Sequence, residues 1–467
     1  MMKILLKEHY SVKIYKEKQD LDKDEYSLSP DSFALLEKYQ SRKIFKGILP
    51  FLFQKKENCY QLQADYYIGV DWLIEGEKFV QVEPKINQKH IDNFDNFEKN
   101  IDAEGEQTTT NQKDDKSDNV KEINFVKMLL DVYASEISTE HTADLVNIFW
   151  NEKPIPIEQN QDTLTPFLVV QFLGILKNIV RKGLKKSYYK VRENLNNRVK
   201  GKILVGTHIK QNVLKNRFTK TFCEYQVFGE DNLENQFLKK VFQFCSHYIE
   251  NFKGFPSKNE VQQIINYCRP TFELISTDIE QSELKNIKHN PFFKEYKEAI
   301  QIGNLILKRF SYNISRATQQ EQIEIPPFWI DMPKLFELYV YKKLLENEDL
   351  HSKIHYQFGT HGNQLDFLIS DGENSLIIDT KYKLKYDYGH IHEDIRQVSG
   401  YARLKKVREK IGFSEQNDKN INCLIIYPKI VEANKNLCWE EFLKEENEIK
   451  SYYKIFKFGV SLPVIES

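Results

Sequence analysis

Two acidic residues and a lysine, Asp366, Asp379 and Lys381, lie in a segment that reads as two β-strands joined by a turn at Asp371-Gly372. Asp379 and Lys381 are two positions apart, so in a strand their side chains point to the same face. Residues 375–378, Ser-Leu-Ile-Ile, have the composition of a buried central strand. Burying a carboxylate in such a strand costs folding free energy unless the group is paired or binds a metal ion.

These residue types are the ones that metal-assisted phosphodiester cleavage requires. Carboxylate oxygens are hard ligands suited to Mg²⁺ or Mn²⁺, and such an ion polarises a phosphate and helps to form a hydroxide nucleophile. We therefore predict a metal site made of Asp366, Asp379 and the backbone carbonyl of Thr380. Lys381 is expected to orient the attacking water or to stabilise transition-state charge. On the motif alone, a surface hairpin with a chance D-x-K is an equal alternative.

Two predicted helices flank the strands. Residues 332–346 form an amphipathic pattern that carries Glu337, and residues 394–403 form a second helix. In the second helix Gln397 and Tyr401 are four positions apart and share a face. An ordinary helix that packs Tyr401 on the sheet is the alternative there. The order of a helix acid, D, D-x-K and Q-x-x-x-Y is much harder to obtain by chance.

This order resembles the core of the PD-(D/E)xK nucleases, with Leu365 at the place of the proline, and its Q-x-x-x-Y helix is similar to the RecB-like branch. The resemblance implies a restriction-endonuclease-like α/β core. It also implies that Glu337 completes the metal site from an outer position, and that Glu337, Gln397 and Tyr401 belong to the catalytic site.

Composition sets outer limits on the protein. The 467 residues contain 67 Lys+Arg and 68 Asp+Glu, so net charge argues neither for nor against nucleic acid, and any DNA affinity must come from local patches. From the sequence we expect no apolar run that approaches the roughly 18 residues of a membrane span. The N-terminus does not have the pattern of a signal peptide. The six cysteines are scattered, which favours reduced thiols in a cytoplasmic protein rather than a zinc or iron–sulfur site.

Changes in composition divide the chain into four predicted parts of an α+β and α/β multidomain protein. Residues 1–86 look β-rich, and residues 87–122 are acidic and read as a disordered linker or insertion. Residues 123–310 look mainly helical, and residues 311–467 carry the nuclease pattern. No P-loop motif is present in the sequence, so nucleotide hydrolysis would need another polypeptide.

A basic stretch with interleaved tyrosines lies at 181–202, where the sequence itself offers only Glu193 in opposition. Clusters of this kind neutralise phosphates, which makes the stretch a candidate DNA-binding surface. A solvated helix face is the alternative. The residues predicted to contact the DNA backbone are Lys182, Lys185, Lys186, Lys190 and Arg192.

Several further segments resemble McrC-like proteins, the endonuclease subunits of McrBC-type modification-dependent restriction systems. They are Gly69-Val70 with 82–86, the region 182–203, 223–235, and 332–340 ahead of the acidic strands. Together with the strands they cover roughly residues 65–410, less the acidic insertion. The poorly matching first 60 residues leave the N-terminal part least defined.

The resemblance implies a DNA endonuclease that acts on methylated double-stranded DNA together with a ring of McrB-like AAA+ GTPase subunits. In such systems the partner recognises the modified base, and docking is expected on the N-terminal region, residues 1–86. Two other functions stay open: a repair or recombination nuclease with a RecB-like core, and a non-catalytic adaptor of a AAA+ ring.

Overall fold

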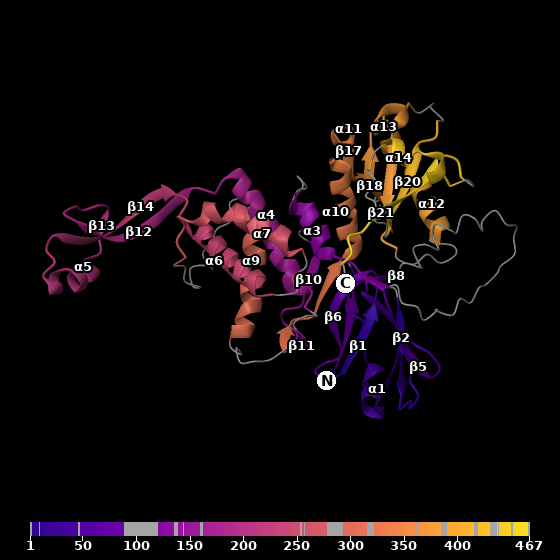
Figure 1. Cartoon of the computed structure of the whole chain (residues 1–467), viewed down its shortest axis with the longest axis horizontal. Coiled ribbons are helices and arrows are strands. Elements are labelled where there is room, and N and C mark those ends of the chain that lie inside the picture. Colours follow the sequence, from indigo (N-terminus) through magenta and orange to yellow (C-terminus); the bar gives the residue numbers. More distant parts are fainter. Residues whose placement is uncertain are drawn as a thin grey trace. The chain divides into compact units, whose positions relative to one another are not determined.

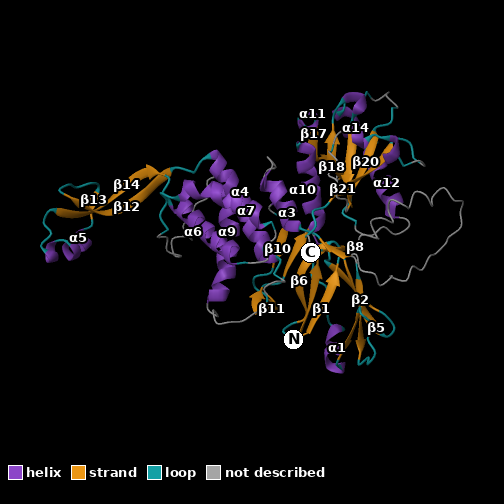
Figure 2. Ribbon diagram, viewed as in Figure 1, coloured by secondary structure: helices purple, strands orange, loops and turns teal. Residues whose placement is uncertain are grey.

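The structure is a computed structural model in which helices and strands are mixed along the chain (Figures 1 and 2). It describes residues 2–8, 10–44, 47–87, 120–134, 139–142, 144–158, 162–252, 255, 257–277, 293–314, 322–360, 363–383, 390–414, 419–429, 437, 439–449 and 452–465. The chain groups into two compact units. One comprises Met1–Leu164 with Thr318–Ser467, and the other comprises Thr165–Ala317.

The N-terminal part of the first unit is built on two sheets. The larger has the order β1 (Met2–Lys7), β7 (Lys78–Glu83), β6 (Tyr67–Ile74), β16 (Phe328–Asp331) and β10 (Val146–Ile148). The smaller has the order β3 (Glu25–Leu28), β2 (Ser11–Lys16), β5 (Cys59–Ala64) and β4 (Phe51–Lys55). Ile4, Leu62 and the fully buried Trp329 belong to one core that the two sheets share. Helix α1 (Pro30–Leu36) begins at a proline, and the Ser29 side chain before it accepts a hydrogen bond from the backbone N–H of Ser32.

This N-terminal part is not built from residues 1–86 alone, because β16 and β10 come from later in the chain and complete its larger sheet. Gly69 of β6 lies opposite Trp329 of β16, and a Cβ at Gly69 would meet the Phe328 carbonyl oxygen at 2.1 Å. Only glycine allows the two backbones to approach this closely. The sequence division at residue 86 therefore differs from the grouping that the tertiary contacts give.

The rest of the first unit holds a second five-stranded sheet, in the order β17 (Ile354–Thr360), β18 (Asn363–Ile369), β19 (Leu376–Thr380), β20 (Asn422–Lys429) and β21 (Ile455–Ser461). β17, β18 and β19 are antiparallel, and β19, β20 and β21 are parallel. Helix α10 (Met332–Leu345) and helix α12 (His390–Tyr401) both contact β19. The predicted acidic strands and both flanking helices are thus confirmed as secondary structure.

The second unit combines helices with a long hairpin. Its helices include α4 (Leu164–Lys182), α6 (Leu233–Asn251), α7 (Lys258–Cys268) and α9 (Lys294–Ile314). Strands β12 (Ser187–Asn196) and β14 (Lys220–Gly229) pair along their full length, and β13 (Lys202–Ile203) joins β14. Figure 1 shows this hairpin projecting from the helices of its unit, with α5 (Val205–Gln211) at the far end. The basic stretch therefore lies largely on a strand, not on the helix face weighed from the sequence.

The remaining elements connect these parts. Within the first unit β8 (Lys85–Asn87) pairs with β9 (Val120–Glu122), and β11 (Ile155–Glu158) pairs with β15 (Gln322–Ile325). Its other helices are α3 (Phe125–Ala134), α11 (Glu348–His351), α13 (Lys405–Lys410) and α14 (Trp439–Phe442). Of the predicted acidic linker, residues 88–119 lie outside the described residues, and β8 and β9 mark its two ends.

Helix α4 corrects one expectation from the sequence. By length and composition this helix could cross a membrane, yet 83% of its most apolar 18-residue stretch is buried within the protein. Burial of this kind is that of a core helix.

The five described cysteines are all buried and free, and Cys438 lies outside the described residues.

Candidate functional site

The two aspartates predicted to act together lie opposite one another on neighbouring strands. The antiparallel register pairs Phe367 of β18 with Ile378 of β19, so the next residues, Asp366 and Asp379, face each other where this ladder ends. Residues directly opposite on adjacent strands lie on the same face of a sheet, with Cβ atoms about 4.5–5.5 Å apart. The pairing of the strands thus brings two carboxylates together that are distant in sequence.

Asp366 is anchored by the strand that carries the other acid. Its Oδ2 accepts hydrogen bonds from the backbone N–H and from the hydroxyl of Thr380, each at 2.6 Å. Both donors act on one oxygen, so they hold the carboxylate in a fixed orientation. Burial raises the pKa of Asp366 to about 6, the nearby Glu337 carboxylate adds to the rise, and the Thr380 bonds oppose it.

Asp379 is 2% exposed and makes an ion pair with Lys381, whose Nζ lies 2.7 Å from Oδ2. The approach of the ammonium is not that of a directional hydrogen bond, and among the described residues this oxygen has no hydrogen-bond partner. Burial raises the pKa of Asp379 to about 7, and the charge of Asp366 contributes. For Lys381, burial lowers the pKa, but the nearby carboxylates, Asp379 above all, together outweigh it and leave the pKa raised.

Lys381 is also the first member of a polar chain that leads to helix α12. Its ammonium donates to Gln397 Oε1 at 2.7 Å, and the Gln397 amide donates to the Tyr401 hydroxyl at 2.7 Å. Tyr401 is 8% exposed and packs in the core beneath the helix. The structure therefore brings Lys381, Gln397 and Tyr401 into one connected set, and the glutamine fixes the direction of the lysine.

Glu337 of α10 lies close to this set but makes its hydrogen bonds to another strand. Its Oε1 accepts from the Gln357 amide of β17 at 3.0 Å, and the same amide donates to the Tyr356 hydroxyl at 3.0 Å. Burial raises the pKa of Glu337, and bonds from Gln357 and Tyr356 oppose the rise. Among the described residues no three acidic, histidine or cysteine side chains lie close enough to share one ion, so Glu337 is not grouped with both aspartates as a direct ligand.

The donor set nevertheless suits one hard divalent cation. A partly buried carboxylate, Asp366, faces a buried one, Asp379, and among the described residues one oxygen of Asp379 has an ammonium beside it but no hydrogen-bond partner. Burial raises the pKa of both aspartates, and a neighbouring carboxylate adds to each rise, that of Glu337 for Asp366 and that of Asp366 for Asp379. A divalent cation would remove that penalty, and oxygen ligands fit Mg²⁺ or Mn²⁺.

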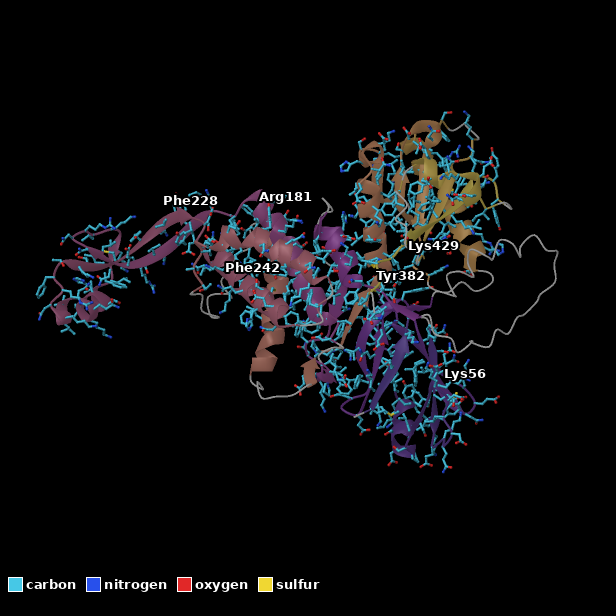
Figure 3. The ribbon with its side chains drawn as sticks, in the orientation of Figure 1. Lys56, Arg181, Phe228, Phe242, Tyr382 and Lys429 are labelled. Atoms are coloured by element: carbon cyan, nitrogen blue, oxygen red, sulfur yellow. The ribbon has the colours of Figure 1, made fainter. Side chains whose placement is uncertain are left out.

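Tyr382, which follows the lysine, connects the site to the N-terminal sheets of the same unit. Its hydroxyl donates to the buried Glu8 at 3.3 Å, and its ring contacts Tyr66 and Phe336 with centroids 6.0 and 5.6 Å away. Figure 3 shows where Tyr382 lies in the chain. Phe336 immediately precedes Glu337 on α10, and α10 continues directly from β16 of the N-terminal sheet. The end of β19 that leads to Lys381 and helix α10 are therefore both packed against that sheet.

The residues predicted to bind DNA all have acidic partners within their own unit. Lys182 pairs with Glu295, Lys185 with Glu234 at 2.6 Å, Lys186 with Glu230 at 3.5 Å, and both Lys190 and Arg192 with Glu224 at 4.0 and 2.7 Å. These acids are far away in sequence, so they did not appear as opposition to the basic stretch. The side chains of Lys182, Lys186, Lys190 and Arg192 remain exposed, whereas Lys185 is nearly buried.

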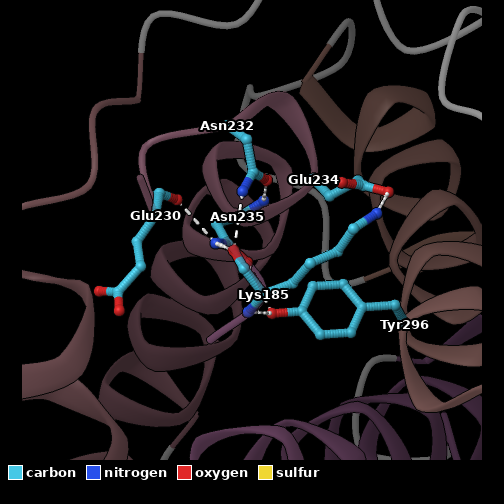
Figure 4. A network of polar contacts seen from close by, with 6 residues as sticks. All are labelled: Lys185, Glu230, Asn232, Glu234, Asn235 and Tyr296. Carbon is cyan, nitrogen blue, oxygen red and sulfur yellow. Dashed lines mark hydrogen bonds and ion pairs between the residues drawn. The ribbon is translucent and has the colours of Figure 1, made fainter. Parts of the chain in front are cut away.

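Lys185 instead belongs to a polar network at the base of the hairpin (Figure 4). Its backbone N–H donates to the Tyr296 hydroxyl at 2.8 Å, and its carbonyl accepts from Asn232 and Asn235 at 2.8 and 2.9 Å. Asn235 also accepts from the Tyr296 hydroxyl at 2.8 Å. Asn232 is the N-cap of α6, so one cluster fixes the start of that helix and the start of β12 together.

The structure adds Gln357, Tyr356, Tyr382 and Glu8 to the residues around the site. The first two lie on a strand that the sequence pattern did not connect to Glu337. Tyr382 directly follows the D-x-K motif, but only its burial against the N-terminal sheet distinguishes it from a solvent-exposed tyrosine. No signal in the sequence pointed to Glu8.

Comparison with known proteins identifies the family. A family model described as "McrBC 5-methylcytosine restriction system component" matches residues 62–428. No curated protein matches the chain. A solved half-complex from a tetradecameric assembly of Thermococcus gammatolerans McrB AAA+ hexamers with bound McrC has 14% identity and TM-score 0.35, covering 98% of this chain and 94% of that chain.

The cryo-EM structure of the Thermococcus gammatolerans McrBC complex has 14% identity and TM-score 0.29, covering 74% of this chain and 87% of that chain. Similarities this distant assign no role to any residue of this chain. The family match, by contrast, spans more than three quarters of the sequence and includes both Gly69 and the acidic strands. The chain belongs to the family of McrBC 5-methylcytosine restriction system components.

Proposed function

We propose that this chain is the DNA-cleaving subunit of a McrBC-type restriction system, with a PD-(D/E)xK nuclease core at the end of β18 and β19. The observation that carries the proposal is the pair of facing carboxylates, the partly buried Asp366 and the buried Asp379, with Lys381 against the second of them. Membership of the McrBC component family supplies the biological setting. A purely structural role for two close carboxylates with raised pKa values would be costly to stability.

The residues divide the work of phosphodiester hydrolysis. Asp366 and Asp379, with the backbone carbonyl of Thr380, would hold a Mg²⁺ or Mn²⁺ ion. Such an ion supplies charge neutralisation at the scissile phosphate and lowers the pKa of water. Lys381 presents its ammonium to the attacking water or to the developing negative charge, where a preorganised donor stabilises the transition state.

Gln397 and Tyr401 keep that ammonium in place. The Gln397 carbonyl oxygen accepts from Lys381 and its amide donates to Tyr401, so reversing the amide would turn its N–H donors toward the ammonium and lose the bond to Lys381. Glu337 contributes negative charge beside Asp366 and would act on the site from outside the direct ligands.

Cleavage is proposed to depend on a partner, because the sequence carries no P-loop and the family is that of multicomponent restriction systems. The proposed partners are a ring of McrB-like AAA+ GTPase subunits and double-stranded, methylated DNA. The solved Thermococcus gammatolerans half-complex has McrC bound to McrB AAA+ hexamers.

Two surfaces are candidates for docking that ring. The first is the N-terminal region 1–86 favoured by the sequence. The second is the hairpin of the helical unit, whose apolar side chains are exposed, as Figure 3 illustrates for Phe228. Large apolar groups in water are typical of surfaces that an assembly covers. The exposed apolar residues on and beside this hairpin include Tyr188, Val199, Val205, Leu214, Phe218 and Phe228.

Cleavage of methylated and unmethylated plasmid DNA tests the proposed function. The full chain with its AAA+ partner, GTP and Mg²⁺ should cut methylated DNA, and Asp366→Asn, Asp379→Asn or EDTA should abolish the cutting. The chain alone should cut little. Modification-independent cutting by the chain alone would favour the repair-nuclease alternative, and cutting that persists in both aspartate variants would favour the adaptor. A deletion of 1–86 is unsuitable, because it would remove β6 from beside β16, which leads into α10.

A further inference from the structure

Gln357 adopts a backbone conformation that glutamine rarely takes. Its φ is +48°, in the left-handed region, although it lies in the middle of β17. Outside glycine, asparagine and aspartate this region costs roughly 1–2 kcal/mol per residue. Non-glycine residues in such conformations persist where the surroundings hold them, and they cluster at functional sites.

The position of this residue in the sheet links it to the acidic pair. The β17–β18 register pairs Tyr356 with Phe367 and Phe358 with Leu365, which places Gln357 opposite Asp366. Asp366 in turn lies opposite Asp379. Gln357, Asp366 and Asp379 therefore occupy one level across three neighbouring strands.

The side chain of Gln357 reaches the remaining acid of the site. Its amide donates to Glu337 Oε1 on α10 at 3.0 Å and to the Tyr356 hydroxyl at 3.0 Å. The Tyr356 ring is itself fixed by stacking on Tyr341 of the same helix, with centroids 4.6 Å apart and an interplanar angle of 11°. An amide with both protons committed to two fixed acceptors holds those acceptors in one arrangement.

We propose that Gln357 is a positioning residue of the nuclease site, held in the left-handed conformation so that its amide fixes Glu337 beside Asp366. This inference rests on the proposed nuclease function. A competing explanation exists in the fold itself, because β17 is an edge strand and irregular backbone at an edge discourages pairing with other chains. The two explanations differ in what they predict for activity.

Two substitutions separate the amide from the backbone strain. Gln357→Gly removes the side chain and relieves the left-handed conformation, so the melting temperature should stay the same or rise. Gln357→Asn tolerates the conformation but is one methylene shorter, so it should not reach Glu337. Both variants should lose kcat for DNA cleavage by about 10- to 100-fold, the scale of a misplacement near 1 Å, while KM for DNA stays unchanged.

Lys454→Gly is the matched control. Lys454 has φ +57° and lies just before β21, away from the acidic pair, so its substitution should relieve similar strain without changing kcat. A second arm uses Glu337→Gln. If Gln357 acts through Glu337, then adding Gln357→Gly to Glu337→Gln should lower kcat no further, because the two substitutions interrupt one interaction.

Isothermal titration with Mn²⁺ gives a readout independent of turnover. Gln357→Gly should weaken Mn²⁺ binding measurably, because Glu337 beside Asp366 is no longer fixed, but less than Asp379→Asn does, since the amide does not touch the ion. Wild-type kcat in both Gln357 variants would overturn the proposal, and protection of the sheet edge would then be the remaining explanation for the irregular backbone of β17. Fully additive effects of Gln357→Gly and Glu337→Gln on kcat would overturn it as well. An inactive wild-type complex would instead refute the proposed function. In that case, Mn²⁺ affinity equal to wild type in both Gln357 variants would overturn the positioning role as well.

Discussion

Replacing Asp379 with asparagine should stabilise the metal-free protein at pH 8. Asp379 is 2% exposed, and burial together with Asp366 raises its pKa to about 7. Relative to the ordinary value of 3.8 this rise is about three units, or about 4 kcal/mol at roughly 1.36 kcal/mol per unit. The raised pKa already includes the opposing attraction of Lys381, and the shift is shared with Asp366, so a net gain of about 1–3 kcal/mol is expected.

The pH dependence follows from the direction of the shift. An acid whose pKa is higher in the folded than in the unfolded protein binds more protons when folded. The unfolding free energy of the metal-free wild type should therefore fall as pH rises from about 4 to about 7 and level off above that, as far as this group is concerned. Asparagine carries no charge, so the variant should lack this part of the fall.

Thermal unfolding in EDTA and in Mg²⁺, at pH 5 and pH 8, measures both effects. In EDTA at pH 8 the variant should melt about 2–12 °C above wild type, at roughly 2–4 °C per kcal/mol. Mg²⁺ at 100 times its Kd should stabilise wild type by about 2.7 kcal/mol and the variant hardly at all.

Asp371→Asn is the matched control. Asp371 lies in the turn between β18 and β19, is 39% exposed and pairs with Lys353 at 3.0 Å. Its loss should change stability by less than about 1 kcal/mol and keep the Mg²⁺ effect. A lower melting temperature for Asp379→Asn in EDTA at pH 8 would show that Asp379 and Lys381 form a stabilising structural ion pair, and the metal-site reasoning would fail.

Three further predictions follow from the same contacts. Lys381→Ala should lower kcat by about 100-fold or more at saturating DNA, and rescue by raised DNA concentration would show a binding role instead. Tyr382→Phe removes the hydrogen bond to Glu8 and should lower kcat more than Tyr339→Phe, which removes a buried hydroxyl elsewhere in the unit. Equal kcat in the two variants would show that the hydrogen bond to Glu8 does not support the site. Lys185→Ala should lower the free energy of unfolding, measured by chemical denaturation, by about 3–5 kcal/mol. Lys190 is exposed and lies 4.0 Å from its partner, so Lys190→Ala should lower it by less than about 1 kcal/mol. Similar losses of unfolding free energy in the two variants would contradict a stabilising role of the network around Lys185.

The sequence by itself determined the local elements around the site and their chemistry. Short apolar runs that each carry one aspartate specify β18 and β19, and the turn at Asp371-Gly372 lets them pair, which leaves Asp366 opposite Asp379. The four-residue spacing of Gln397 and Tyr401 likewise places them on one face of α12, where they meet each other. These relations are short-range, so backbone geometry alone carries them.

The tertiary structure decided everything that depends on partners distant in the chain. The acids that neutralise the basic stretch come from β14, α9 and the start of α6, so a cluster that looked unopposed is paired. β16 joins β6 more than 250 residues earlier and completes a sheet that the sequence divided at residue 86. Gln357 reaches Glu337 only because β17 folds back beside β18. A linear pattern records which groups are present, whereas burial and cross-strand register determine which of them meet.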